Sequence, residues 1–324
     1  MKLIFRTIAP AILAAFFFPM AGIAQAAYPD KPVRVLVVFP PGGSNDVTAR
    51  IVFRTVEEQM GKSFTIENRG GAAGSLGTAV VAERPADGYT VMVQSTTHIA
   101  NAFMYKGKLP YDTLGDFIGI TPMARQVGML ITTPTLPAKS LEEFIALAKK
   151  RPGDINAATA GLGSFVHLNL AMFMSMTDTD MVLVAYKGGG PSKIAVMSGE
   201  CQATIQTIGS AFKLIKAGKL RPLGVTSKER NPKFPNVPAI GEIVPGFEFT
   251  AWVGAFVPAK TPDAIVTKLN LELKKALSDP DTVKRLTDVT LDPMYMTVPQ
   301  FQARLKSDYA RYEKLMKQIG VIED

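Results

Sequence analysis

A glycine-containing turn between a buried strand and a helix constrains this chain more than any other feature. The β-branched run at residues 33–38 predicts a buried strand. Residues 40–43, Pro-Pro-Gly-Gly, stop that strand and allow a tight turn, and Ser44 and Asp46 supply helix-start chemistry. Free N–H groups and the positive end of the helix dipole favour an anion at such a turn. The turn therefore indicates either an anion site or a tight connection with nothing bound.

The same pattern of strand, small-residue loop and helix recurs twice more in the first third of the chain. Residues 64–67 predict a strand that enters a loop with the spacing G-x-x-G-x-x-G, which is not the dinucleotide fingerprint G-x-G-x-x-G. A third predicted strand, 89–93, ends near Ser95 and Thr96. The carboxyl ends of parallel strands meet at one edge of a sheet, where ligands bind. The two hydroxyls can bind a ligand there or cap the next helix.

A second block of alternating strands and helices begins near residue 128, after a stretch at 109–123 that we expect to be rich in loops. Its predicted strands lie at 155–159, 182–186, 203–206 and 223–226, each followed by glycine or a hydroxyl residue. A proline-rich return segment at 234–246 precedes a strand at 251–257. The pattern predicts an α/β protein of two lobes with a ligand cleft between them and two crossing segments. One lobe consists of residues 27–127 and 251–324, and the other of residues 128–250.

The N-terminus has the features of a secretory signal. Lys2 and Arg6 precede an apolar stretch at 8–18, and Ala24-Gln25-Ala26 is a small-x-small cleavage site. The alternative, a membrane anchor, is disfavoured because the uninterrupted apolar core, 11–18, is far shorter than the roughly 20 residues of a span. We therefore expect a signal peptide at residues 1–26, cleavage after about Ala26, and a periplasmic protein.

Composition excludes several functional classes. The one cysteine, Cys201, allows no intrachain disulfide, and the two histidines form no H-x-x-x-H pattern that would indicate a metal. The formal net charge is +8, but the basic residues are scattered and not interleaved with aromatic residues, so nucleic-acid binding is not expected. We expect a monomer without a cofactor or metal, whose partner is a small organic anion.

Eight segments, in order along the chain, resemble the tripartite tricarboxylate transporter receptors, which are periplasmic solute-binding proteins of the Bordetella-uptake type. They lie at residues 32–50, 67–74, 86–90, 163–168, 186–191, 218–223 and 235–238 and in the strand around Trp252. The resemblance implies a type II periplasmic binding protein fold that closes over its ligand. It also implies delivery of a small carboxylate (a di- or tricarboxylate, an aromatic acid or an acidic amino acid) to a membrane permease.

The resemblance also implies a set of ligand-binding residues and no catalytic ones. They are Gly42, Gly43, Ser44, Ser95, Thr96, Gly161, Gly163, Ser164, His167, Tyr186, Lys187 and Gln206. Positions expected to select the acid lie around Phe103, Phe165, Gln206, Thr207 and Ser210. Several backbone N–H groups can bind a carboxylate without an arginine. Asp46 would repel an anion, so we interpret it as a helix-capping residue.

Two other functions remain open from the sequence. The protein could report a bound ligand to a signalling membrane protein instead of a permease. It could also be a secreted hydrolase, because Ser164 and His167 lie three residues apart on one predicted helix face. That pair lacks a third residue to orient the histidine. We therefore expect a receptor and not an enzyme.

Overall fold

The structure, a computed structural model, describes residues 28–318, 320 and 322, so the predicted signal peptide lies outside the described residues. The strands are β1 (Val33–Val37), β2 (Phe64–Asn68), β3 (Thr90–Ser95), β4 (Phe117–Thr132), β5 (Asn156–Thr159), β6 (Val182–Ala185), β7 (Ala203–Thr207), β8 (Arg221–Val225), β9 (Thr250–Pro258) and β10 (Asp292–Pro293). The α-helices are α1 (Ser44–Met60), α2 (Ser75–Ala82), α3 (Thr97–Met104), α4 (Leu141–Lys150), α5 (Phe165–Thr177), α6 (Gly189–Ser198), α7 (Ile208–Lys216), α8 (Ile240–Ile243), α9 (Asp263–Ser278), α10 (Pro280–Asp288) and α11 (Val298–Gln318). A short 3₁₀ turn, η1 (Ala72–Gly74), precedes α2.

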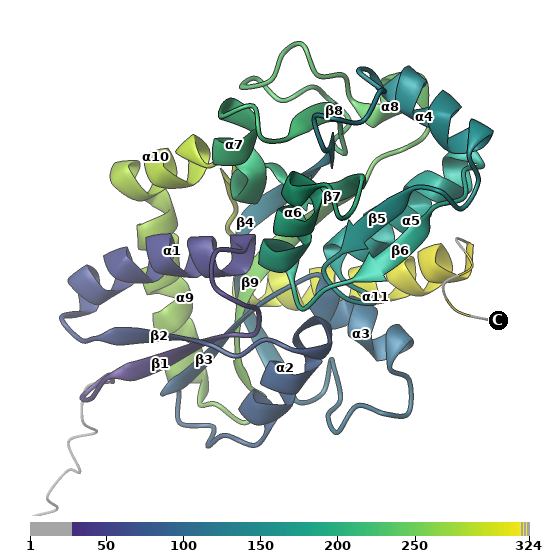
Figure 1. Cartoon of the computed structure of the whole chain (residues 1–324). Coiled ribbons are helices and arrows are strands. Elements are labelled where there is room, and N and C mark those ends of the chain that lie inside the picture. The colour runs from purple at the N-terminus through teal and green to yellow at the C-terminus, as the bar shows by residue number, and fades with distance from the viewer. Residues whose placement is uncertain (1–27, 319, 321, 323–324) are drawn as a thin grey trace, which may run out of the picture.

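The strands form one mixed, continuous array in two groups, in the order β2-β1-β3-β9-β4-β7-β5-β6 (Figure 1). In the first group β1 runs parallel to β2 and β3, and β9 runs antiparallel to β3 and β4. In the second group β5 is parallel to β6 and β7, while β7 and β8 run antiparallel to β4. Helices cover both groups, and this arrangement directs the carboxyl ends of the parallel strands toward the space between them.

Both faces of the first group of strands are buried. Val35 packs in one apolar cluster with α1 and α9, whereas Leu36 packs in a second cluster on the opposite face. This alternation follows from the period of two along a strand. The second cluster extends through Phe165, Phe249 and Tyr312, so it joins the two halves of the molecule.

Strand β4 crosses between the two groups, and here the expected loop at 109–123 is wrong from Phe117 onward. The register on β9 shifts between Gly119 and Thr121 and between Pro122 and Ala124. Such irregularities let a strand accommodate glycine and proline. The lobe limits, residues 27–127 with 251–324 and 128–250, remain our prediction of which segments move together.

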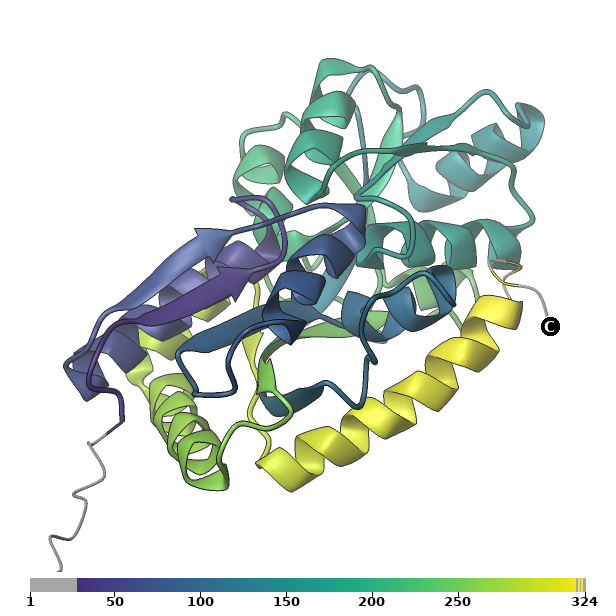
Figure 2. The same cartoon turned by 90° about the horizontal axis from the view of Figure 1, so that it is seen from below.

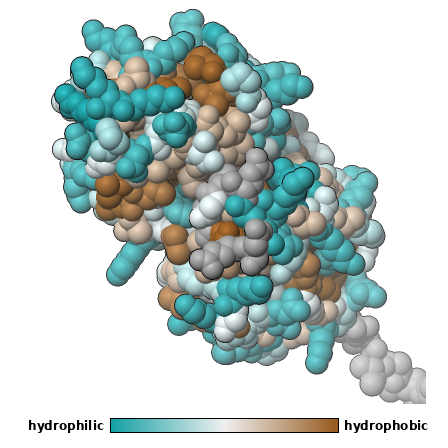
Figure 3. All heavy atoms as spheres, turned by 90° about the vertical axis from the view of Figure 1, so that its right-hand side faces the viewer, coloured by the Kyte–Doolittle hydropathy of each residue, from teal (hydrophilic) through white to brown (hydrophobic). Residues whose placement is uncertain are grey.

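Helix α11 runs along one side of the molecule and reaches below α5 and β6 (Figures 1 and 2). It is fixed to β9 by a buried hydrogen bond of 2.9 Å from Trp252 Nε1 to Asp308 Oδ2. Within the described part of the chain, no helix has the length and apolarity needed to cross a membrane. On the face shown in Figure 3, hydrophilic side chains predominate and hydrophobic ones form separate groups.

Candidate ligand-binding site

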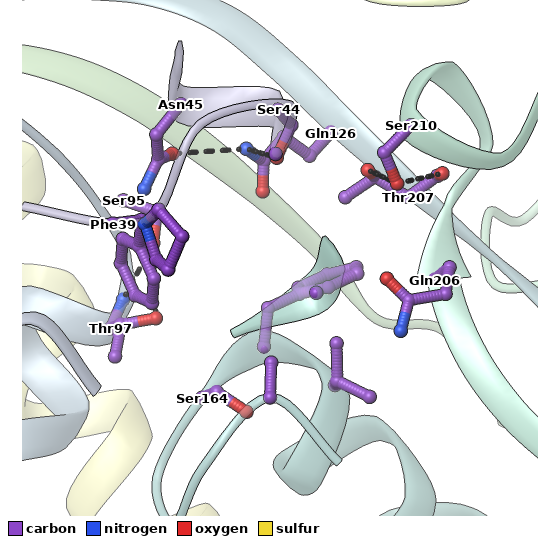
Figure 4. A pocket seen from close by; sticks show the side chains of 16 residues that line it. Phe39, Ser44, Asn45, Ser95, Thr97, Gln126, Ser164, Gln206, Thr207 and Ser210 are labelled. Atoms are coloured by element: carbon purple, nitrogen blue, oxygen red, sulfur yellow. Dashed lines mark hydrogen bonds between the residues drawn. The ribbon is translucent and has the colours of Figure 1, made fainter. Parts of the chain in front are cut away.

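A cavity lies where the two groups of strands face each other, with about 490 Å³ of space free of protein atoms when its opening to solvent is included (Figure 4). Its polar side chains are Ser44, Asn45, Ser95, Thr97, Gln126, Ser164, Gln206, Thr207 and Ser210. Phe39, Pro40, Gly43, Ala160, Phe165, Val166 and Gly189 complete the wall. No lining residue is an Asp, Glu, Lys or Arg, so the wall offers hydrogen bonds and apolar contacts but no formal charge.

Five helices begin at this cavity. Their N-cap residues are Gly43 for α1, Thr96 for α3, Ser164 for α5, Gly188 for α6 and Thr207 for α7. Each of these helices contributes its N-cap or its first residue to the wall. The first N–H groups of a helix have no acceptor within the helix, and its dipole is positive at that end. The convergence creates a positive potential without a cation and favours an anion.

Hydrogen bonds within the wall orient several of these groups. Gln126 Nε2 donates to Ser44 Oγ at 2.7 Å and to Asn45 Oδ1 at 3.4 Å. Ser44 Oγ is therefore an acceptor toward Gln126, and its own hydrogen is free to point elsewhere. In Figure 4, Asn45, Ser44 and Gln126 lie along one side of the cavity, with Thr207 and Ser210 next to Gln126 in this view and Ser164 on the opposite side.

Five of the twelve predicted ligand-binding residues line the cavity: Gly43, Ser44, Ser95, Ser164 and Gln206. Of the positions expected to select the acid, Phe165, Thr207 and Ser210 also lie on its wall. Phe103 is not part of the wall and packs against Tyr309, with ring centroids 4.5 Å apart.

The other seven predicted residues are not part of the cavity wall. Gly42 donates its N–H to Asp46 Oδ2, and Thr96 is the buried N-cap of α3. The hydroxyl of Tyr186 donates to Glu200 Oε1 at 2.7 Å, and Lys187 is exposed. The remaining three are Gly161, Gly163 and His167.

His167 is buried but lines a separate surface depression, together with Asp178 and Thr179. Gly163 N–H donates to His167 Nδ1 at 3.2 Å, and burial lowers the pKa of His167, so the imidazole is neutral. Ser164 Oγ accepts from the backbone N–H of His167 at 3.2 Å as the cap of α5. Between these two side chains the described structure shows no hydrogen bond of the kind a hydrolase needs.

Glycines allow the two halves of the molecule to touch around the cavity. An ideal Cβ added at Gly188 would lie 2.9 Å from Pro40 Cδ, and one added at Gly163 would lie 2.7 Å from Met104 Cγ. Gly70 lies in the same half of the molecule as Pro40, and a Cβ added there would lie 2.7 Å from the same atom, Pro40 Cδ. A side chain at Gly188 or Gly163 would therefore crowd the opposite half of the molecule.

Asp46 is satisfied within its own half of the molecule. Its carboxylate accepts from Gly42 N at 2.9 Å, Arg50 Nε at 3.0 Å and Asn68 Nδ2 at 2.9 Å. Burial opposes ionisation, but these hydrogen bonds outweigh it and lower the pKa of Asp46. The carboxylate is therefore neutralised at the start of α1 and is not part of the cavity wall.

Several wall residues were not predicted, chiefly Asn45, Thr97 and Gln126. Asn45 and Thr97 each adjoin a predicted residue, so the loops were recognised but not every side chain in them. Gln126 comes from the crossing strand, 82 residues from Ser44 along the chain. Its signal in the sequence is a polar residue in a largely apolar run, next to the predicted crossing at 127/128.

Residues 48–321 of the chain match the sequence model of a protein family, the tripartite tricarboxylate transporter family receptor. The chain belongs to this receptor family. The receptor is also similar to three solved structures. An R. palustris protein with adipate is 32% identical, with a TM-score of 0.88 and coverage of 90% of this chain and 98% of that one. MatC from Rhodopseudomonas palustris, with bound malate, is 29% identical, with a TM-score of 0.82 and coverage of 89% and 99%.

The third structure is the periplasmic binding protein BugD. It is 27% identical to the receptor, with a TM-score of 0.88 and coverage of 92% of this chain and 100% of that one. These similarities confirm the family resemblance and the two-lobed α/β binding-protein fold predicted from the sequence, with a cleft between the lobes.

Proposed function

We propose that this receptor captures a small organic carboxylate in the periplasm by closing its two lobes, and hands it unchanged to a membrane permease. The observation that carries the proposal is the convergence of five helix N-termini on a cavity without charged side chains. Relatives of the same fold have been solved with adipate and malate, which are small dicarboxylates.

The wall suits both parts of such a ligand. Backbone N–H groups and the hydroxyls of Ser44 and Ser164 can donate to carboxylate oxygens, and each such bond to a charged group is stronger than a neutral one. Phe39, Phe165 and Val166 provide apolar contacts for the carbon skeleton. Closing the lobes removes water from the carboxylate and strengthens its interaction with the helix ends.

A thermal-shift screen of the chain from residue 27 tests the binding step. The panel contains mono-, di- and tricarboxylates, aromatic acids and acidic amino acids, each beside its uncharged amide. At about 100 times its Kd, a matching acid should raise the Tm by about 5 °C, and its amide should not. A shift caused by amides or sugars but by no acid would contradict the proposal.

Uptake by cells tests the delivery step separately. Deleting the gene should abolish uptake of the acid identified in the screen, and the wild-type gene should restore it. If uptake persists while a transcriptional response to the acid is lost, the receptor serves a sensor and delivery to a permease is wrong.

A further inference from the structure

Lys193, a residue outside the cavity wall, forms no ion pair with any carboxylate in the part of the chain that the structure describes. It lies on α6, and its side chain is 8% exposed. Its hydrogen bond runs from Nζ to the carbonyl oxygen of Ser210 at 2.6 Å. A buried charge without a counter-ion is costly, so its retention needs a reason.

This ammonium contacts a residue of the cavity wall. Gly189 and Lys193 are four residues apart on α6 and share one face, and Gly189 lines the cavity. Ser210, whose carbonyl receives the ammonium, also lines the cavity. The neighbouring Ser192 accepts from Gln206 Nε2 at 2.7 Å, and Gln206 is a further wall residue. Lys193 therefore contacts residues of the wall but is not part of the wall itself.

We infer that Lys193 supplies the counter-charge of the bound anion from behind the wall and so makes the site selective for acids over neutral molecules of the same shape. This inference rests on the proposed function, because it assigns the charge partner of the same cavity. The ligand would be a carboxylate whose negative charge compensates the buried ammonium without touching it.

Burial supports this role without abolishing the charge. Removal from water lowers the pKa of Lys193 to about 8, so the side chain remains mostly protonated at neutral pH. In the weakly polarisable interior, a buried charge that contacts the wall acts on a ligand more strongly than a charge on the surface at the same distance. The five helix ends bind the carboxylate oxygens directly, and Lys193 contributes longer-range attraction that an amide cannot exploit.

The test compares acids with their own amides by calorimetry: adipate with adipamide, malate with malamide and benzoate with benzamide. Lys193→Met removes the charge at similar length, and Lys193→Gln removes the charge but keeps a donor for the Ser210 carbonyl. Lys213→Met, at an exposed position on the neighbouring α7, is the matched control. Both Lys193 variants should lose about tenfold or more in acid affinity, with amide affinity and the control within about twofold of wild type.

Each other result overturns the inference. Equal losses for acid and amide, or a lowered Tm of the ligand-free Lys193→Met protein with unchanged binding, would make Lys193 a structural link between α6 and α7. Acid binding unchanged in both Lys193 variants would show that the charge has no role. If the wild-type protein binds no acid at all, the proposed function itself fails. That outcome is distinct from acid binding that is equal in wild type and the Lys193 variants, which overturns only the inference about Lys193.

Discussion

Gln126 is the residue at which the crossing strand and the first ligand loop meet. Its amide nitrogen contacts Ser44 Oγ and Asn45 Oδ1, and the residue is 1% exposed. Because Ser44 accepts this bond, its hydroxyl hydrogen can point to the ligand. The side chain thus positions a donor that the family resemblance implied, although the pairing itself depends on a contact between residues 82 apart in the chain.

Replacing Gln126 with methionine keeps the volume and removes both hydrogen bonds. We expect the affinity for the acid to fall about tenfold, because the Ser44 hydroxyl is no longer oriented to donate a hydrogen bond to the ligand. Calorimetry of Gln126→Met beside Gln59→Met, at an exposed position on α1, measures the effect. Equal affinity of the two variants would show that Ser44 needs no help from the crossing strand.

His98 makes stability depend on pH. It is fully buried, its Nε2 donates to the carbonyl of Thr113 at 2.9 Å, and burial lowers its pKa to about 4. In the unfolded chain, His98 has a pKa near 6.5, so it binds a proton at a higher pH there than in the folded protein. The stability that neutral His98 contributes is therefore fully present above pH 6.5 and is lost as the pH falls below that value. Urea unfolding should show that, between pH 7 and pH 5, the free energy of unfolding falls by about 2 kcal/mol less in His98→Phe than in wild type. The same loss in both proteins would contradict this assignment.

At the scale of elements, the strand-loop-helix units were predictable because glycines, prolines and hydroxyl residues mark their boundaries. The loop and the start of the helix at Ser44 follow from residues 40–46, and the apolar stripe through Val56 continues the helix that ends at Met60. Strand β4 was not predictable over its first half, because Gly119 and Pro122 indicate a loop unless β9 is there to pair with a bulged strand. The charge on α6 was also missed, since a lysine on a helix usually indicates a solvated face.

Two serine residues that cap helices allow an effect on helix stability to be distinguished from an effect on ligand binding. Ser164 Oγ accepts from His167 N, and Ser140 Oγ accepts from Glu143 N, both at 3.2 Å, but only Ser164 lines the cavity. Changing either serine to alanine should reduce the free energy of unfolding by about 1 kcal/mol. Only Ser164→Ala should also reduce acid affinity, by about tenfold, because its hydroxyl hydrogen reaches the ligand. If both variants bind as wild type does, Ser164 is a cap alone.

At the scale of the whole molecule, two lobes and a cleft could be inferred from two blocks of α/β units. The contacts that close the cleft could not, because they join residues distant in the chain. Pro40 meets Gly188 at this seam, whereas Gly199, at the other end of α6, has nothing within 4 Å of an added Cβ. Both glycines have positive φ, 125° and 84°. Alanine at either position strains the backbone, but only alanine at 188 obstructs closure.

Gly188→Ala should therefore bind the acid more weakly than Gly199→Ala, by about tenfold or more. Its free energy of unfolding should also fall further in the ligand-free form, because Gly188, at φ 125° and ψ 174°, has a conformation that almost only glycine adopts, whereas Gly199 is in the left-handed helical region. Calorimetry and urea unfolding of the two proteins provide the comparison. Closure over the ligand is not required for tight binding if their affinities agree.

Hydrogen exchange with and without the best acid of the screen tests the central claim most directly. The account predicts slower exchange of backbone N–H groups at residues 44–46, 97–98, 165–167, 189–190 and 208–210, where five helices begin at the cavity. The first turns of α4 and α9, at residues 141–143 and 263–265, should not change. An acid that raises the Tm but leaves the five cavity segments unprotected would contradict binding at the helix N-termini.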